Sequence, residues 1–184
     1  MIEKIENSIP GHYLYPAYIF ADRKPHLVTT VLGSCVSVCF YDPVMKIGGL
    51  NHFMLPLWNG EGLASPKYGN IAIEKLLDKL FSLGVGKNNL IAKVFGGADS
   101  LEQKQNFYRI GARNIILAMD ILEEKKIKVI SQSTGGNTGR NIKFHTGTGE
   151  VLLRYIKKSP VIVSQKNLPV NGKKVIDLKT ENKR

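Results

Sequence analysis

The sequence predicts an α/β or α+β domain with mixed β-sheets. Segments rich in β-branched and aromatic residues alternate along the chain with two segments of helical spacing. A late pair of strand-like segments, 142–144 and 151–155, is joined by a short stretch that contains glycine, which is typical of an antiparallel hairpin. The length of 184 residues suits one hydrophobic core. We therefore expect one domain over residues 1–158 and a basic extension over residues 159–184.

The first part of the chain contains three candidate strands. Residues 26–32 and 35–41 are predicted to be extended because β-branched and aromatic residues dominate them, and Gly33 separates the two. A third strand is expected over residues 47–55, where Pro56 ends it.

A loop over residues 57–68 is expected to lead into an amphipathic helix over residues 70–83. The helix is predicted from apolar side chains at i, i+3, i+4 and i+7, which are Ile73, Leu76, Leu77 and Leu80. Gly84 is placed to cap its C-terminus.

The second part of the chain repeats this alternation before the hairpin. Residues 90–95 form a short apolar segment closed by Gly96 and Gly97, which predicts a strand. Helical spacing returns around residues 115–124, and residues 127–130 are again strand-like.

Composition limits the class of protein. Hydrophobic residues make up 43% of the chain and charged residues 22%, which excludes global disorder. The longest uncharged run, residues 25–41, is shorter than the roughly 20 apolar residues of a membrane-spanning helix. Residues 1–13 lack the apolar core of a secretory signal. We expect a cytoplasmic protein without membrane insertion.

Cysteine and histidine spacing gives no sign of a disulfide framework or a metal site. Cys35 and Cys39 lie four positions apart, and on one strand their geometry is poor for a mutual disulfide. The other histidines, His12, His26 and His145, have no companion at metal-ligand spacing. We expect free thiols, no metal and no cofactor.

The formal net charge of +11 raises the question of nucleic-acid binding. Residues 157–184 hold eight Lys or Arg against two Asp or Glu, so more than half of the excess lies in the tail. The tail lacks the interleaved aromatic residues of a stacking platform. A solvated extension is the favoured interpretation, and no nucleic-acid partner is expected.

The segment GSCVSVC contains the first candidate for chemistry. Cys35 follows Gly33 and Ser34, where the chain can bend and present backbone N–H groups that stabilise a thiolate or an oxyanion. A cysteine in a strand is also commonly a packing residue, so both interpretations stand for Cys35. Cys39, between Val38 and Phe40, is expected to be a buried packing residue.

A histidine on the next candidate strand supplies a possible base. His52 lies 17 residues after Cys35, and neighbouring strands can bring the two side chains within reach. A base needs a partner that fixes its tautomer, and spacing does not choose among the candidates Thr29, Thr30, Ser34 and Asn51.

Two glycine-containing segments could in principle bind phosphate. VFGGADS lacks the third glycine of a dinucleotide fingerprint and the Lys of a P-loop. STGGNTGR is typical of a tight turn. Nucleotide binding is disfavoured at both.

Taken in order, the motifs LGSCVSVCFYDP, GGLNHFMLP, FGGA, IGARN and TGGN resemble the CheD family of chemoreceptor glutamine deamidases. The resemblance extends over roughly residues 13–157, so residues 1–158 would be a CheD-like deamidase domain. It implies the fold of the cytotoxic necrotizing factor type of deamidating toxin, with stacked mixed sheets and helices on the outside.

The resemblance also implies a catalytic set. Cys35 falls on the family's nucleophile, His52 on its histidine and Thr29 on the threonine that orients the histidine, with Thr30 one position away. The expected reaction is thiol-dependent conversion of chemoreceptor glutamine to glutamate with release of ammonia. Hydrolysis of receptor methyl esters could use the same intermediate.

Chemoreceptors are the expected substrates, and CheC, a phosphatase, is a possible partner. Asp99-Ser100-Leu101 departs from the residues expected for CheC contact, which argues against that partner. Trp58 and its loop are a candidate for part of the substrate-binding face. The alternatives are a non-catalytic adaptor that binds CheC or receptors and, less favoured, a nonspecific nucleic-acid binder.

Overall fold

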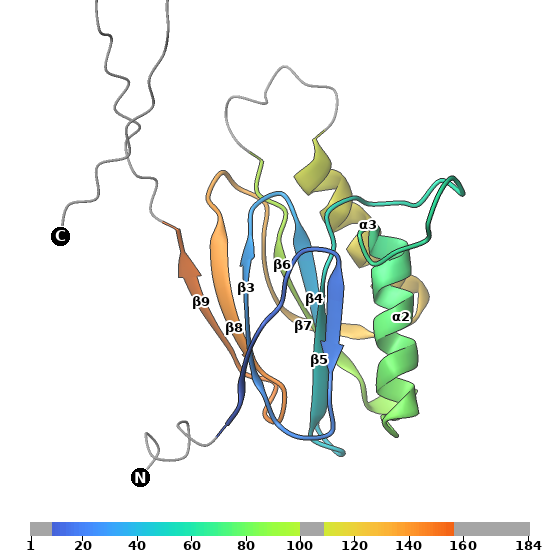
Figure 1. The fold of residues 1–184 in the computed structure, drawn as a ribbon, viewed down its shortest axis with the longest axis vertical. Helices are drawn as coiled ribbons and strands as arrows, with labels where there is room; N and C mark the ends of the chain where they lie inside the picture. The colour runs from blue at the N-terminus through green and yellow to red at the C-terminus, as the bar shows by residue number, and fades with distance from the viewer. Residues whose placement is uncertain (1–8, 100–108, 157–184) are drawn as a thin grey trace, which may run out of the picture.

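Two β-sheets pack face to face, and two helices cover the outer face of the larger sheet (Figure 1). The structure, a computed structural model, describes residues 9–99 and 109–156. The predicted extension over residues 159–184 therefore lies outside the described residues.

The larger sheet has five strands in the order β2-β5-β4-β6-β7. All neighbouring pairs are antiparallel except β6 and β7, which are parallel. The strands are β2 (Tyr18–Ala21), β4 (Val36–Asp42), β5 (Ile47–His52), β6 (Ile91–Gly96) and β7 (Lys128–Thr134).

The smaller sheet has four strands in the order β1-β3-β8-β9. It pairs β1 with β3 in parallel, and the other two pairs are antiparallel. Its strands are β1 (Gly11–Tyr13), β3 (Leu27–Leu32), β8 (Arg140–His145) and β9 (Val151–Tyr155). Both sheets are thus mixed, as the sequence predicts.

The helices are α2 (Gly69–Ser82) and α3 (Ile110–Glu124), with a short 3₁₀ turn over Lys87–Asn89. The apolar stripe predicted for α2 is buried against the larger sheet. Gly84 follows its C-terminus at φ +94°, in the left-handed conformation of the expected cap.

Side chains of the central strand β4 alternate between two cores. Val36, Val38 and Phe40 pack toward the helices, whereas Cys39 packs into the core between the two sheets. The sheet–sheet core also contains Leu50 of β5 and the strand residues Leu32, Phe95, Ile142 and Phe144.

The structure confirms the fold class and the order of the predicted elements. The second helix begins at Ile110, earlier than predicted, and β7 continues to Thr134. The N-terminal strands β1 and β2 were not predicted, because they have only three and four residues and are half-exposed or exposed.

Among the described residues, no helix is both long and apolar enough to cross a membrane. The likeness to the necrotizing factor toxins stays a prediction.

Candidate active site

The cysteine bend, residues 33–35, carries the chain from β3 in the smaller sheet to β4 in the larger one. Donors from other parts of the chain hold all three of its carbonyl oxygens. They are the N–H of Ala98 to Gly33 (2.8 Å), Nδ2 of Asn114 to Ser34 (3.0 Å) and the N–H of Gly97 to Cys35 (2.8 Å). Three consecutive carbonyls fixed in this way leave the bend little freedom to rotate its peptide planes.

The end of β6 approaches the cysteine bend closely. Gly96 has φ +108°, and a Cβ at this position would collide with the carbonyl oxygen of Cys35. Glycine is therefore required both for its backbone angle and for its lack of a side chain. The FGGA segment supports the cysteine in this way, and the sequence did not predict that role.

The two thiols have different surroundings. Cys35 is half-buried and packs against the sheet–sheet core. Burial raises its pKa, and a hydrogen bond from its own backbone N–H opposes that rise. Cys39 is fully buried, and desolvation raises its pKa to about 12, so it stays a thiol that packs in the core, as predicted.

His52 ends β5 on the same face as Cys35. Val36 and Phe53 form a β-bridge, and both side chains lie in the helix-side core. Their chain neighbours Cys35 and His52 therefore point the other way, toward the space between the sheets. They are diagonal neighbours on adjacent strands, a separation that side chains can bridge.

A threonine of the opposite sheet determines the tautomer of His52. The hydroxyl of Thr30 donates to the carbonyl of Leu14 at 2.8 Å and lies 2.8 Å from His52 Nδ1. Because its one proton goes to Leu14, the hydroxyl accepts from the imidazole, which places the ring proton on Nδ1. Nε2 is left with a lone pair, and it is buried with no hydrogen-bond partner among the described residues. An unpartnered basic nitrogen on the same face as a thiol suits a general base.

Burial also sets the charge of this ring. Desolvation lowers the pKa of His52 to about 4, against a smaller opposing contribution from the nearby Leu14 backbone. At neutral pH the pair is thus a neutral thiol and a neutral imidazole. No hydrogen bond joins Sγ to Nε2 here, a contact that commonly tightens only when substrate binds.

The threonine that contacts the imidazole is Thr30, whereas the family resemblance pointed to Thr29. The alternation of β3 explains the difference: Val28, Thr30 and Leu32 are buried against the other sheet, and Thr29 lies on the opposite face. Of the remaining candidates, Asn51 accepts a hydrogen bond from the N–H of Val38. The carbonyl of Ser34 is held by Asn114.

Two residues that sequence reasoning did not single out brace the site. Asn114 of α3 is fully buried and donates from Nδ2 to the carbonyls of Ser34 and Met54, at 3.0 and 2.9 Å. Arg140 of β8 is also buried and donates to the carbonyls of Gly96 and Gly135. A signal for Asn114 was present, because it lies on the apolar stripe of its helix with Ala118 and Leu122.

Of the other histidines, His12 lies in β1 beside the ring of Phe20, and the remaining two hydrogen-bond within turns. His26 Nδ1 lies 2.9 Å from the carbonyl of Lys24, and His145 Nδ1 accepts from the N–H groups of Gly147 and Thr148. In residues 9–99 and 109–156, no group of three or more His, Cys, Asp and Glu side chains is arranged to hold a metal ion.

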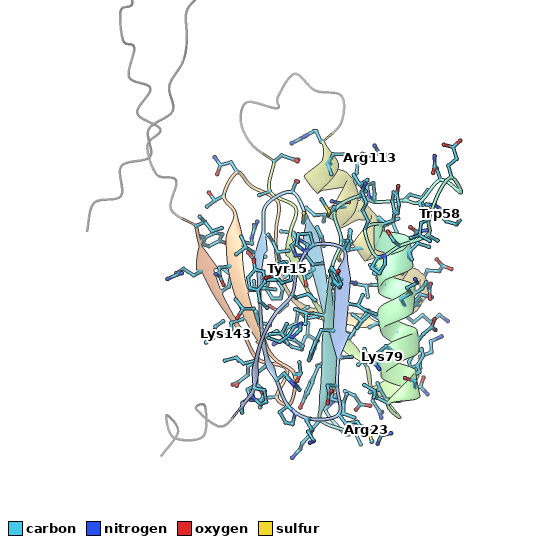
Figure 2. The ribbon with its side chains drawn as sticks, viewed as in Figure 1. Tyr15, Arg23, Trp58, Lys79, Arg113 and Lys143 are labelled. Atoms are coloured by element: carbon cyan, nitrogen blue, oxygen red, sulfur yellow. The ribbon has the colours of Figure 1, made fainter. Side chains whose placement is uncertain are left out.

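Trp58 lies on the loop between β5 and α2, which projects beside the start of α2 in Figure 2. Its indole Nε1 donates to the carbonyl of Glu61 at 2.8 Å, so the side chain is fixed within its own loop. The loop is closed by a bridge between Leu55 and Tyr68.

Comparison with known proteins gives consistent matches. The family model described as CheD chemotactic sensory transduction matches residues 54–155. A protein of Trichlorobacter lovleyi, named probable chemoreceptor glutamine deamidase CheD, is 50% identical over 153 residues, which cover 83% of this chain and 95% of that protein. A protein of the same name from Sulfurimonas denitrificans is 45% identical over 148 residues, covering 80% and 95%.

Among solved structures, a Neisseria meningitidis protein of the family model DUF152 is similar at a TM-score of 0.42. Its sequence identity is 13%, over 73% of this chain and 67% of that one. A likeness this distant adds nothing to the assignment of the fold.

Proposed function

Because the chain belongs to the CheD family, we propose that it hydrolyses the side-chain amide of particular glutamines on the cytoplasmic domains of chemoreceptors. The products are glutamate and ammonia. The observation that carries the proposal is the free Nε2 of His52, on the same face as Cys35 and with its tautomer fixed by Thr30.

In the first half of the reaction, Cys35 is the nucleophile. Its thiol proton passes to Nε2 of His52 as Sγ attacks the amide carbon of the substrate, and the carbonyl oxygen becomes an oxyanion. The imidazolium then gives this proton to the departing nitrogen, which leaves as ammonia. The remaining species is a thioester between Cys35 and the glutamyl side chain.

In the second half, water replaces the thiol. Nε2 of His52 accepts a proton from water as the water oxygen attacks the thioester carbon. The tetrahedral intermediate collapses, Sγ leaves and recovers the proton from the imidazolium, and the side chain is now a carboxylic acid. A glutamate methyl ester would give the same thioester with methanol as the leaving group, so methylesterase activity belongs to the same proposal.

We expect exposed aromatic side chains on and near β2, and the loop that carries Trp58, to contact the substrate. Tyr18 of β2 is paired with His52 and is 62% exposed, and Tyr15, labelled in Figure 2, is 64% exposed. Large aromatic side chains suit contact with a helical receptor surface. Replacement of Trp58 by alanine tests the contribution of the loop through the rate of receptor deamidation.

The decisive experiment is mass spectrometry of a chemoreceptor cytoplasmic fragment after incubation with the protein. The wild-type protein should produce the small mass increase of an amide-to-acid change at particular glutamines. Cys35→Ala and His52→Ala should produce none, and Cys39→Ala, at the buried second thiol, should keep the activity.

The alternative is an adaptor that binds receptors or CheC without turnover. It predicts a folded wild-type protein that binds the fragment and leaves every glutamine unchanged. Retained deamidation in Cys35→Ala would equally overturn the proposed mechanism. Binding of CheC is a separate matter. Two of the residues at the positions expected for CheC contact, Ser100 and Leu101, lie outside the described residues.

A further inference from the structure

Asn114 joins the two halves of the candidate site. Its side chain reaches from α3 to the cysteine bend, 80 residues away in the sequence, and to Met54, two residues after His52. Figure 1 shows the β3–β4 connection and the start of α3 at the same end of the molecule. One amide group thus holds both the segment of the nucleophile and the segment of the base.

The contact with Ser34 acts on a particular peptide unit. The carbonyl of Ser34 and the N–H of Cys35 belong to one planar trans peptide, so they point in opposite directions. When Asn114 holds the carbonyl on the helix side, the N–H is turned away from the helix. That N–H lowers the pKa of the Cys35 thiol, against the rise caused by burial.

The same N–H is well placed to meet developing charge in the reaction. A thiolate at Sγ, and the oxyanion that forms when Sγ attacks an amide carbon, both gain from a backbone donor fixed in advance. Free rotation of the 34–35 peptide would remove that donor. Ala98 and Gly97 hold the neighbouring carbonyls, which leaves Asn114 as the donor to the middle one.

Packing alone does not account for an asparagine at this position. The side chain is fully buried on the apolar stripe of α3, and its Oδ1 has no partner among the described residues. A buried polar atom without a partner costs stability, so a leucine or alanine would serve helix packing better. This cost indicates that the two hydrogen bonds donated by Nδ2 have a role of their own.

We propose that Asn114 is a positioning residue that aims the Cys35 N–H at the reacting atoms and fixes the spacing of Cys35 and His52. The inference rests on the proposed function for its catalytic meaning. The proposed geometry can be tested without a substrate, through the reactivity of the Cys35 thiol.

The test uses Asn114→Asp, which keeps the size of the side chain but turns an acceptor toward two carbonyl oxygens, and Asn114→Ala, which removes the group. In a Cys39→Ala background, the rate of alkylation of Cys35 by iodoacetamide is measured against pH. Both variants should shift the profile to higher pH and slow alkylation at pH 7 about tenfold. With a receptor fragment, kcat should fall about 10- to 100-fold while KM changes little.

The matched control is Leu122→Ala, a buried change in the helix-side core about two turns after Asn114 on the same helix. It should lower stability and leave the alkylation profile of Cys35 unchanged. An unchanged profile in folded Asn114→Asp or Asn114→Ala would overturn the proposal, as would an equal shift in Leu122→Ala. If both Asn114 variants fail to fold while Leu122→Ala folds, the role is structural and the proposal fails. If the Asn114 variants shift the alkylation profile of Cys35 as expected but the wild-type protein deamidates nothing, the proposed function fails and the positioning role of Asn114 stands.

Discussion

At the scale of single residues, the hydroxyl of Thr30 decides which nitrogen of His52 can act as a base. One hydroxyl proton cannot serve both the Leu14 carbonyl and the imidazole, so the ring must donate from Nδ1. Without the hydroxyl, the ring could place its proton on Nε2, where it could not accept the thiol proton.

The first prediction concerns this hydroxyl. Thr30→Val keeps the shape of the side chain and removes the hydrogen bond to His52, so kcat for deamidation should fall about tenfold to a hundredfold through loss of a correctly oriented base. Thr29→Val is the matched control on the outward face of β3 and should change kcat little. Deamidation of a receptor fragment by mass spectrometry provides both rates. The opposite ranking would return the role to Thr29, in agreement with the family resemblance.

The sequence singled out Cys35 and His52 as candidates, and the family resemblance pointed to Thr29, but spacing alone could not choose between the two threonines. In Leu27–Leu32, either set of alternating residues contains apolar side chains at its ends and a threonine in its middle, so the inward face is ambiguous. Only the pairing of β3 with its neighbours decides the face. The place of Asn114 on the apolar stripe of α3 was visible in the sequence, but its role could not be predicted because its partners lie 60 and 80 residues away.

At the scale of secondary-structure elements, the site depends on how closely the end of β6 approaches the start of β4. Gly96 pairs with Val36 in the sheet, and the N–H of Gly97 donates to the carbonyl of Cys35. The glycines of FGGA thus provide room for the cysteine bend, although the sequence suggested only a phosphate-binding loop as their functional alternative.

The second prediction compares two glycines with positive φ. Gly96→Ala places a Cβ against the carbonyl oxygen of Cys35, so it should displace the bend and abolish most deamidation. Gly136→Ala also has positive φ, +73°, but its Cβ would meet open space. It should cost only about 1 kcal/mol of stability and keep the activity. Urea unfolding and deamidation rates of both variants check the comparison, and equal loss of activity would contradict it.

At the scale of the whole molecule, the buried neutral His52 links folding to pH. In the unfolded chain its pKa returns to the ordinary 6.5, whereas in the folded protein it is about 4. Between these values the unfolded state binds a proton that the folded state does not, so stability falls as pH drops from about 6.5 to about 4.

The third prediction follows from this pH range, in which only the unfolded chain binds a proton at His52. Between pH 7 and pH 4.5 the wild-type protein should lose about 2 kcal/mol more of its free energy of unfolding than His52→Gln, which has no ionisable group at this position. Urea unfolding of the two proteins at both pH values measures the difference. Parallel losses would mean that the ring is not held neutral by burial. Every other ionisable group is common to the two proteins.

The hydrogen bonds from His52 to Thr30 and on to Leu14 cross from one sheet to the other, because β5 belongs to the larger sheet and β3 to the smaller. The spacing of the sheets is set by core side chains such as Leu50, Phe95 and Phe144. A larger side chain forced into that core would push the two layers apart and stretch the contact at the imidazole. Packing in the sheet–sheet core therefore affects the geometry of the candidate site. Substitutions in this core, far from the thiol, are expected to change the rate of the reaction.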